Sequence, residues 1–98
     1  MSFDQKEIDQ VLPLCTALAN EKRLQILLLC FSAPRSVGEL ITLSNIPQSL
    51  VSHHLRKLKE ASLLSSKRAG KKIIYSLKDD HVRCILSDLI AHSKGGCL

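Results

Sequence analysis

Two helix signals separated by a very short break occupy residues 36–61, and they constrain the fold of this chain more than any other feature. Ser36-Val37-Gly38-Glu39 has the spacing of a capping box, in which the serine and glutamate side chains satisfy the first amides of a helix. Ser44-Asn45 is typical of a turn, and Pro47, tolerated in a first helical turn, opens a second helix to about Ala61. This spacing predicts a helix-turn-helix.

A basic β-hairpin is predicted directly after these two helices. The stretches Leu63 to Lys67 and Lys72 to Leu77 contain β-branched and aromatic residues, and Ala69-Gly70 between them is typical of a turn. A hairpin that follows a helix-turn-helix at once is the arrangement of a winged helix. We therefore expect residues 63–77 to form the wing.

Further helices are predicted on both sides of this unit. Apolar residues recur at helical spacing over residues 4–19, where Pro13 predicts a kink or a late start. Asn20 is a candidate N-cap for a second, almost entirely buried helix that ends before Pro34, and a last helix covers residues 79–94. The predicted fold is mainly α with a small β-hairpin, in the order α-α-α-α-β-β-α.

The composition favours one small cytoplasmic domain that pairs with a second copy. The 98 residues are 45% hydrophobic and only 3% aromatic, so a single core over residues 1–98 buries a modest fraction of the surface. We expect a homodimer in which residues 4–19 and 79–94 are the dimerisation helices. The chain starts with polar residues and has no apolar run of about 18 residues, so no membrane partner is expected. Cys15 and Cys30 lie in apolar stripes and are predicted to be buried thiols.

The charge distribution indicates a double-stranded DNA partner. The net charge is +5, and most of the excess lies between residues 56 and 78, where Glu60 is the only acid. Val51, Leu55 and Leu58 form the buried stripe of the fourth helix, and polar side chains occupy its other faces. The residues predicted to contact DNA are Gln48, Ser49, Ser52, His53, Arg56 and Lys57 on this helix and Lys67, Arg68, Lys71 and Lys72 on the wing. RNA is disfavoured because no aromatic stacking platform is present.

Four stretches together resemble the ArsR/SmtB family of bacterial metal-sensing repressors. They are residues 18–27, 36–40, 48–58 and 74–77. The resemblance covers nearly the whole chain and implies a homodimeric winged helix that binds a dyad-symmetric operator and is released by an inducer. It also places Gln48, Ser49, Ser52 and His53 where the family touches DNA.

Asp79, His81 and His92 are the candidate metal ligands. The two histidines are eleven residues apart, so they share a helix face but are separated by about 16 Å along the axis. One ion therefore needs Asp79 and His81 of one chain together with His92 of the partner subunit, which requires antiparallel last helices in a dimer. Imidazole and carboxylate suit Zn²⁺, with Co²⁺ or Ni²⁺ as alternatives. In the alternative in which no metal binds, Asp79 only caps the helix and both histidines form interfacial hydrogen bonds.

This ligand spacing resembles the zinc-sensing branch of the family, with one departure. Gly95 stands where that branch has a fourth ligand, so Cys97 or water is the candidate for this position. Cys84 and Asp88 lie on nearly the same helix face and are weaker candidates. The resemblance also implies a coupling hydrogen bond from the other ring nitrogen of His92 to the carbonyl oxygen of Ser62.

The predicted function is a metal-responsive transcriptional repressor that Zn²⁺, or a related divalent ion, releases from its operator. Ser36 and Gly38 occupy positions where another metal site of the family needs cysteines, so that site is not expected. Two alternatives stay open: a thiol- or persulfide-responsive repressor, in which Cys30 lies two residues beyond the usual cysteine position, and a dimeric metal-buffering or interaction protein without DNA function. The sequence suggests no enzyme, because it contains no arguable nucleophile and base pair.

Overall fold

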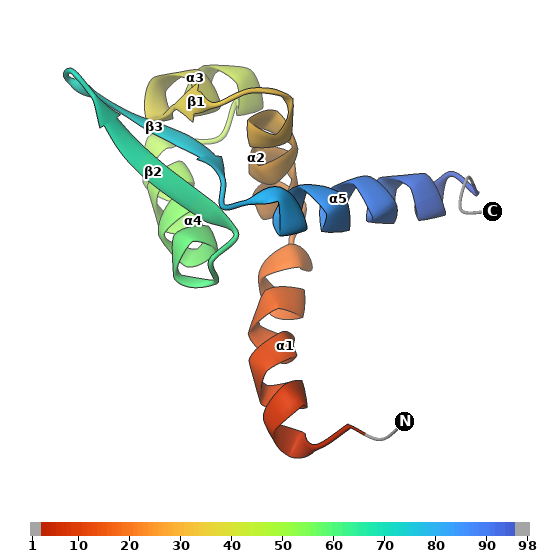
Figure 1. The fold of residues 1–98 in the computed structure, drawn as a ribbon. Helices are drawn as coiled ribbons and strands as arrows, with labels where there is room; N and C mark the ends of the chain where they lie inside the picture. The colour runs from red at the N-terminus through yellow and green to blue at the C-terminus, as the bar shows by residue number, and fades with distance from the viewer. Residues whose placement is uncertain (1–2, 96–98) are drawn as a thin grey trace.

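The computed structural model describes residues 3–95, which form five helices and a small sheet (Figure 1). In chain order the elements are α1 (Gln5–Leu18), α2 (Glu21–Ser32), β1 (Arg35–Ser36), α3 (Val37–Ser44), α4 (Gln48–Glu60), β2 (Leu64–Ala69), β3 (Lys72–Leu77) and α5 (Asp80–Ser93). The fold is a winged helix-turn-helix, as the sequence predicts.

The helix-turn-helix consists of α3 and α4 with three residues, 45–47, between them. The predicted capping box is confirmed: Ser36 Oγ accepts the Glu39 amide at 3.1 Å, and Glu39 Oε1 accepts the Ser36 amide at 3.0 Å. Asn45 ends α3 in the left-handed region with φ 61°. Asparagine tolerates this conformation better than most residues, so α3 ends at Asn45 and α4 begins after only two more residues.

The sheet has three antiparallel strands in the order β1-β3-β2, whereas the sequence predicts only the hairpin. In the hairpin the register runs from Leu64 opposite Leu77 to Ala69 opposite Lys72, and Gly70 takes the positive φ of 65° at the turn. The additional strand β1 has only two residues and pairs with the middle of β3, at Ile74 and Tyr75. A strand this short has no readable alternation, so its pairing depends on tertiary position alone.

One core lies between α2, α3, α4, the base of the wing and the first half of α5. Its buried apolar residues are Ala17, Ile26, Leu27, Cys30, Leu40, Ile46, Val51, Leu55, Leu58, Leu63, Leu64, Leu77, Val82 and Leu86. The predicted buried stripe of α4 is confirmed, because Val51, Leu55 and Leu58 are all in this core. Helix α4 is therefore fixed by one face and presents the others outward.

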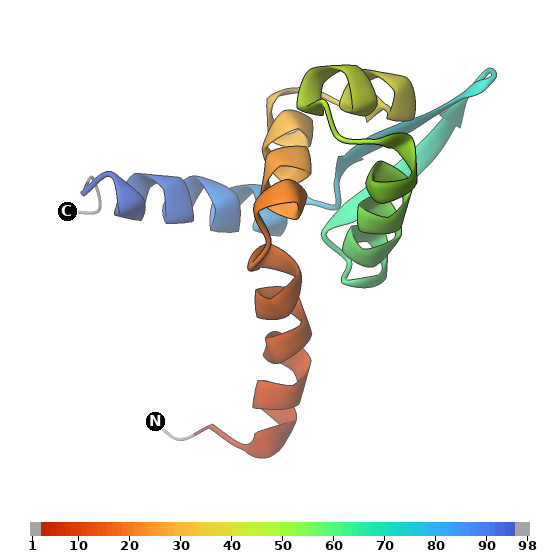
Figure 2. The same ribbon diagram turned by 180° about the vertical axis from the view of Figure 1, so that it is seen from behind.

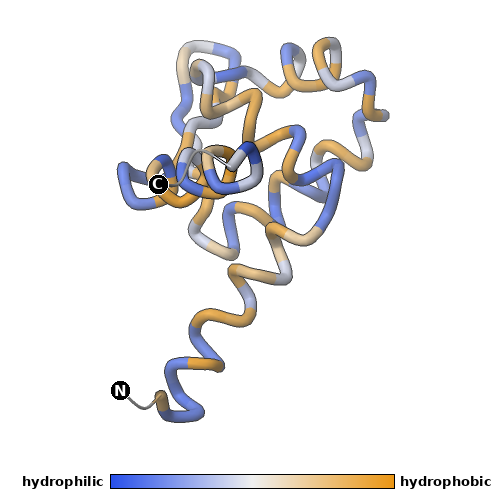
Figure 3. Tube along the Cα trace, turned by 90° about the vertical axis from the view of Figure 1, so that its right-hand side faces the viewer, coloured by the Kyte–Doolittle hydropathy of each residue, from blue (hydrophilic) through white to orange (hydrophobic). Residues whose placement is uncertain are grey.

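Helices α1 and α5 project from the core as two arms, which Figures 1 and 2 show from opposite sides. The Cα radius of gyration is 14.5 Å, larger than the roughly 13 Å of a compact domain of this size. Figure 3 shows apolar and polar residues alternating along α1. The exposed large apolar side chains of the arms are Ile8, Val11 and Leu12 on α1 and Ile85 and Leu89 on α5.

Two smaller sequence predictions are wrong, and a third is wrong in one of its two forms. Of the kink or late start predicted at Pro13, the late start does not occur, because helix α1 starts at Gln5 and runs through Pro13. Pro13 is exposed, so water can satisfy the carbonyl that it leaves unpaired. Helix α2 is not almost entirely buried, because its apolar residues surround the helix and Leu28 remains exposed. Cys30 is buried as predicted, but Cys15 is exposed on the uncovered face of α1.

No helix in residues 3–95 combines the length and the apolar character that crossing a lipid bilayer requires.

Candidate nucleic-acid interface and metal centre

The polar face of α4 is open to solvent over its full length. All six residues predicted to contact DNA from this helix are exposed, and their neighbours on the opposite face are in the core. His53 and Arg56 lie together on the exposed face, with 3.4 Å between His53 Nδ1 and Arg56 Nη2. The face therefore offers amide, hydroxyl, imidazole and guanidinium groups, which are the groups that contact base edges and phosphates.

The start of α4 differs from the other helix starts in residues 3–95. Asp4, Asn20, Ser36 and Asp79 each cap a helix with a side-chain oxygen, whereas Pro47 precedes α4 and provides no side-chain hydrogen bond. The first turn of α4 also contains no acidic residue. Its first amides and the positive end of the helix dipole are thus available to an anion such as a DNA phosphate.

The sequence contains a signal for this uncapped start. Ile46-Pro47 precedes the helix where a serine, threonine, aspartate or asparagine is usual. Pro47 is predicted from the sequence to open the helix, but the anion site that its missing side-chain cap leaves is not predicted.

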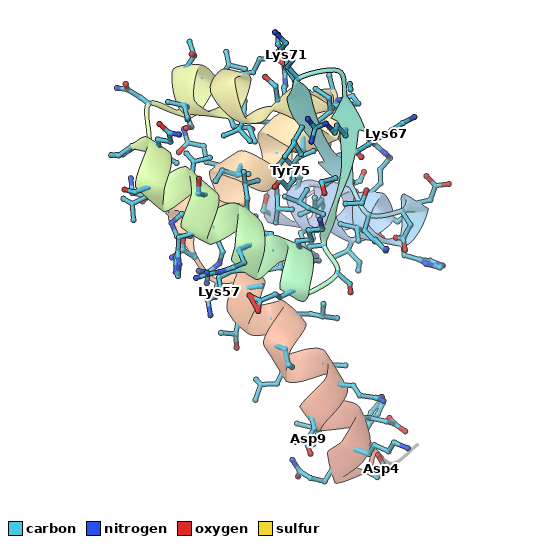
Figure 4. The ribbon with its side chains drawn as sticks, turned by 90° about the vertical axis from the view of Figure 1, so that its left-hand side faces the viewer. Asp4, Asp9, Lys57, Lys67, Lys71 and Tyr75 are labelled. Atoms are coloured by element: carbon cyan, nitrogen blue, oxygen red, sulfur yellow. The ribbon has the colours of Figure 1, made fainter. Side chains whose placement is uncertain are left out.

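The wing carries four exposed cations beside α4: Lys67, Arg68, Lys71 and Lys72. Figure 4 shows Lys71 at the tip of the hairpin, Lys67 farther along it and Lys57 on the outer side of α4. Lys59 donates to Ser66 Oγ and so ties α4 to β2. Arg68 Nε donates to the Gly70 carbonyl at 3.2 Å, which braces the turn. Wing and helix are thus joined by the Lys59–Ser66 contact, and both carry exposed cations.

His54 is a buried residue of α4 that the sequence pattern does not mark as special. Its Nδ1 has no hydrogen-bond partner in the described part of the chain. Burial lowers the pKa of His54 below its ordinary value, and the positive charges of Arg23, His53 and Lys22 lower it further. The neutral form is therefore favoured in the folded protein.

Acidification should destabilise the fold through His54. The unfolded chain binds the proton near the ordinary pKa of 6.5, but the folded chain binds it only at lower pH. The stabilisation is therefore complete above about pH 6.5 and is lost as the pH falls through the pKa of the folded state. Urea denaturation measures the unfolding free energy at about pH 7.5 and at about pH 5.5. We expect this free energy to fall less between the two pH values in His54→Leu than in the parent. Equal losses in both proteins would contradict this role of His54.

Asp79 and His81 lie together at the start of α5. Asp79 Oδ1 accepts the Val82 amide at 3.0 Å, and its Oδ2 is 3.9 Å from His81 Nδ1. The side chains remain 49% and 95% exposed, respectively. Asp79 thus caps the helix with one oxygen while the other is open beside an accessible imidazole, and this oxygen and nitrogen pair fits a Zn²⁺ ion.

The remaining predicted ligand, His92, lies in the last turn of the projecting α5. Within one protomer, no group of three histidine, cysteine or acidic residues among residues 3–95 is arranged to hold a metal ion. Cys97 lies outside the described residues. Cys84 and Asp88 are exposed on α5 and belong to no such group of three among the described residues.

Ser62, the predicted partner of His92, follows α4 in the left-handed region with φ 59°. The free end of α5 points away from α4 (Figure 1), so a hydrogen bond between His92 and Ser62 would have to join two protomers.

Comparison with known proteins identifies relatives that match most of this chain. The family described as "Bacterial regulatory protein, arsR family" matches residues 20–66, from α2 into β2. The transcriptional regulator NmtR of Mycobacterium tuberculosis is 40% identical over 92 residues, which are 94% of this chain and 77% of NmtR. The chain belongs to the arsR family. The family assignment predicted from the sequence is thereby confirmed.

Two further relatives agree with this arsR-family assignment. The transcriptional repressor SmtB of M. tuberculosis is 37% identical over 86 residues, and the chain spans only 64% of that repressor's length. The homodimeric winged helix-turn-helix DNA-binding domain of Mb0332 from Mycobacterium bovis superimposes with a TM-score of 0.87 at 28% identity, covering 95% of this chain and 88% of that domain. This family and fold comprise DNA-binding transcriptional regulators, which are not enzymes.

Proposed function

We propose that this arsR-family protein is a homodimeric, metal-responsive repressor that binds a dyad-symmetric operator and is released by Zn²⁺, with Co²⁺ or Ni²⁺ as alternative inducers. The uncapped start of α4, next to an exposed polar face and a cationic wing, is the observation that carries DNA binding. In this proposal α4 enters the major groove and the wing lies along the phosphate backbone.

The projecting arms support a dimer. Ile8, Val11 and Leu12 on α1 and Ile85 and Leu89 on α5 are exposed apolar residues on helices that extend from the core. Burial of these faces against a second copy would remove them from water. The similarity to the homodimeric Mb0332 domain points to the same assembly. Two recognition helices in such a dimer would bind half-sites about one DNA turn apart.

The donor chemistry of α5 supports a metal shared between protomers. Asp79 and His81 provide an adjacent carboxylate and imidazole, and His92 of the partner subunit would complete a three-ligand core when two α5 helices run antiparallel. Cys97 or water would be the fourth ligand. When bound, the ion would provide a link between the two α5 helices.

This chain's residues would couple that link to DNA in two ways. Val82 and Leu86 anchor α5 in the same core as α4, so a changed angle between two α5 helices would change the spacing of the recognition helices. His92 would also donate its other ring N–H to the Ser62 carbonyl at the end of α4. The reciprocity of binding requires operator DNA to weaken Zn²⁺ binding by the same factor.

The test is a gel-shift titration of DNA from upstream of the gene, with separate arms containing Zn²⁺, Ni²⁺, a chelator or a persulfide. Binding in chelator and release in Zn²⁺ are expected. Release by persulfide but not by metal would instead support the thiol-responsive alternative. Metal binding without salt-dependent DNA binding would support the metal-buffering alternative.

The burial of Cys30 argues against this residue as the responsive thiol of the thiol-sensing alternative. Burial raises the pKa of the Cys30 thiol to about 11, and the nearby charge of Arg35 offsets this only in part. The reactive thiolate of Cys30 is therefore scarce at neutral pH. We accordingly expect Cys30→Ser to leave operator release unchanged.

Arg56→Ala and Lys71→Ala should each weaken operator binding and make it less sensitive to salt. Each lost phosphate contact lowers the slope of log affinity against log salt by about 1. Lys6→Ala is the matched control, because Lys6 is an exposed cation in the first turn of α1, away from the wing. Fluorescence anisotropy over a salt series measures the slopes. Unchanged slopes for both Arg56→Ala and Lys71→Ala would contradict this interface.

A further inference from the structure

Arg83 connects α5 to the end of α2 through two contacts. Its Nη1 donates to the Phe31 carbonyl oxygen at 2.9 Å, and its Cζ lies 4.7 Å from the centroid of the Phe31 ring. The two residues are 52 positions apart in the sequence. This is the only side-chain hydrogen bond from α5 to another element within residues 3–95.

A cation is favourable at the end of α2. The last carbonyl groups of a helix lack intrahelical partners and form the negative end of its dipole, yet α2 has no basic residue in its own last turn. Two arginines from outside the helix place their positive charge there, and the Leu29 carbonyl also accepts the Ala33 amide. Arg83 comes from α5, and Arg35 of β1 donates through Nε to the Leu29 carbonyl at 3.1 Å.

Arg35 extends the connection to the helix-turn-helix. Its Nη2 donates to Ser32 Oγ at 2.8 Å, and its Nη1 is 3.9 Å from Glu39 Oε2. Glu39 is also half of the capping box that starts α3, because its other carboxylate oxygen accepts the Ser36 amide. The contacts therefore run without a break from α5, through the end of α2, to the first turn of α3.

We propose that Arg83 is a positioning residue that holds α5 at a fixed angle to the helix-turn-helix by bridging to the end of α2. The fixed angle of α5 does not depend on the proposed function, whereas the effect on operator spacing rests on it. In a dimer joined through the arms, the angle of α5 sets the separation of the two recognition helices. Arg83 would thus make the protein selective for the spacing of operator half-sites.

The first test measures operator spacing with the full chain in chelator. The upstream operator is compared with versions carrying one base pair more or fewer at its centre, and each such change moves a half-site by about 3.4 Å and turns it by about 34°. We expect Arg83→Ala to reduce the discrimination between spacings by about 2- to 30-fold. Arg83→Lys should retain much of the parent's discrimination between spacings, because lysine can still donate to the Phe31 carbonyl and place its charge over the ring.

Lys94→Ala is the matched control, because it removes the same charge from an exposed position at the other end of α5. It should keep the spacing discrimination of the parent. Equal discrimination in Arg83→Ala and Lys94→Ala would overturn the proposal. A general loss of stability would lower the affinity for all spacings together and would not change their ratio.

The second test needs no DNA. Hydrogen exchange of backbone amides should become faster in Arg83→Ala at the starts of both α5 and α3, but not in the first turns of α1. Unchanged exchange at α3 would overturn the connection through Arg35. If the parent protein binds no operator, the proposed function fails, and hydrogen exchange still decides whether Arg83 positions α5.

Discussion

His92→Gln should leave the dimer bound to its operator when Zn²⁺ is added. Gln retains a polar side chain but lacks the imidazole nitrogen needed as a Zn²⁺ ligand, while the α4 and wing surface is unchanged. The parent should lose operator affinity by about 5- to 150-fold in Zn²⁺, the usual range of allosteric coupling, and the variant by almost nothing. Anisotropy titrations of labelled operator with Zn²⁺ and with chelator measure both factors.

Asp88→Asn provides the control for this experiment. Asp88 is an exposed acidic residue on α5 outside the proposed three-ligand core, so its variant should respond to Zn²⁺ like the parent. Full Zn²⁺-driven release of His92→Gln would refute the shared metal site. Loss of operator binding by His92→Gln in chelator would show that His92 serves DNA binding rather than induction.

Leu89→Glu should convert the dimer into a monomer and reduce operator affinity by about two orders of magnitude or more. The Leu89 side chain is 50% exposed on the projecting α5, and a glutamate there would place like charges close together in a paired interface. A monomer engages one half-site and loses the gain in effective concentration that a linked second half-site provides. Analytical ultracentrifugation and operator titration check the two effects.

Leu43→Glu is the matched substitution. Leu43 is 51% exposed but lies on α3, away from both arms. It should remain dimeric, although the added charge beside the wing weakens its binding to DNA. A dimeric Leu89→Glu protein, or a monomeric Leu43→Glu protein, would show that the arms are not the dimer interface.

The helix boundaries could be predicted because their signals act within a few residues. Asp79 caps α5 by accepting the Val82 amide at 3.0 Å, and Asn20 caps α2 by accepting the Arg23 amide at 3.0 Å. A donor and an acceptor three residues apart are both visible in the sequence. The same holds for the capping box of α3 and for the buried stripe of α4.

Features that depend on distant residues could not be predicted in this way. Strand β1 exists because Arg35 lies opposite Tyr75, 40 positions away, and nothing within its own two residues marks a strand. The hydrogen bond from Arg83 to the Phe31 carbonyl likewise joins residues far apart in the sequence, so no local pattern predicts it. The apolar stripe containing Cys15 shows which face of α1 is hydrophobic, but whether that face is covered depends on a partner outside the chain.

The candidate metal site combines both kinds of information. Asp79 and His81 are neighbours in the sequence and in the structure, so their pairing follows from local spacing. The distance of His92 along the same helix predicts that one chain cannot complete the site. The contribution of the partner subunit remains a prediction, because it depends on how two α5 helices meet.

The missing side-chain cap of α4 leaves the first amides of this helix free to bind a group from outside the protein. The amides of Gln48 and Ser49 have no side-chain acceptor at the helix start, so the first turn is the part of α4 most prone to fray. A phosphate of the duplex would serve as the absent cap. Part of the free energy of DNA recognition would then be spent on completing protein secondary structure, and these two amides should gain protection from exchange when the operator binds.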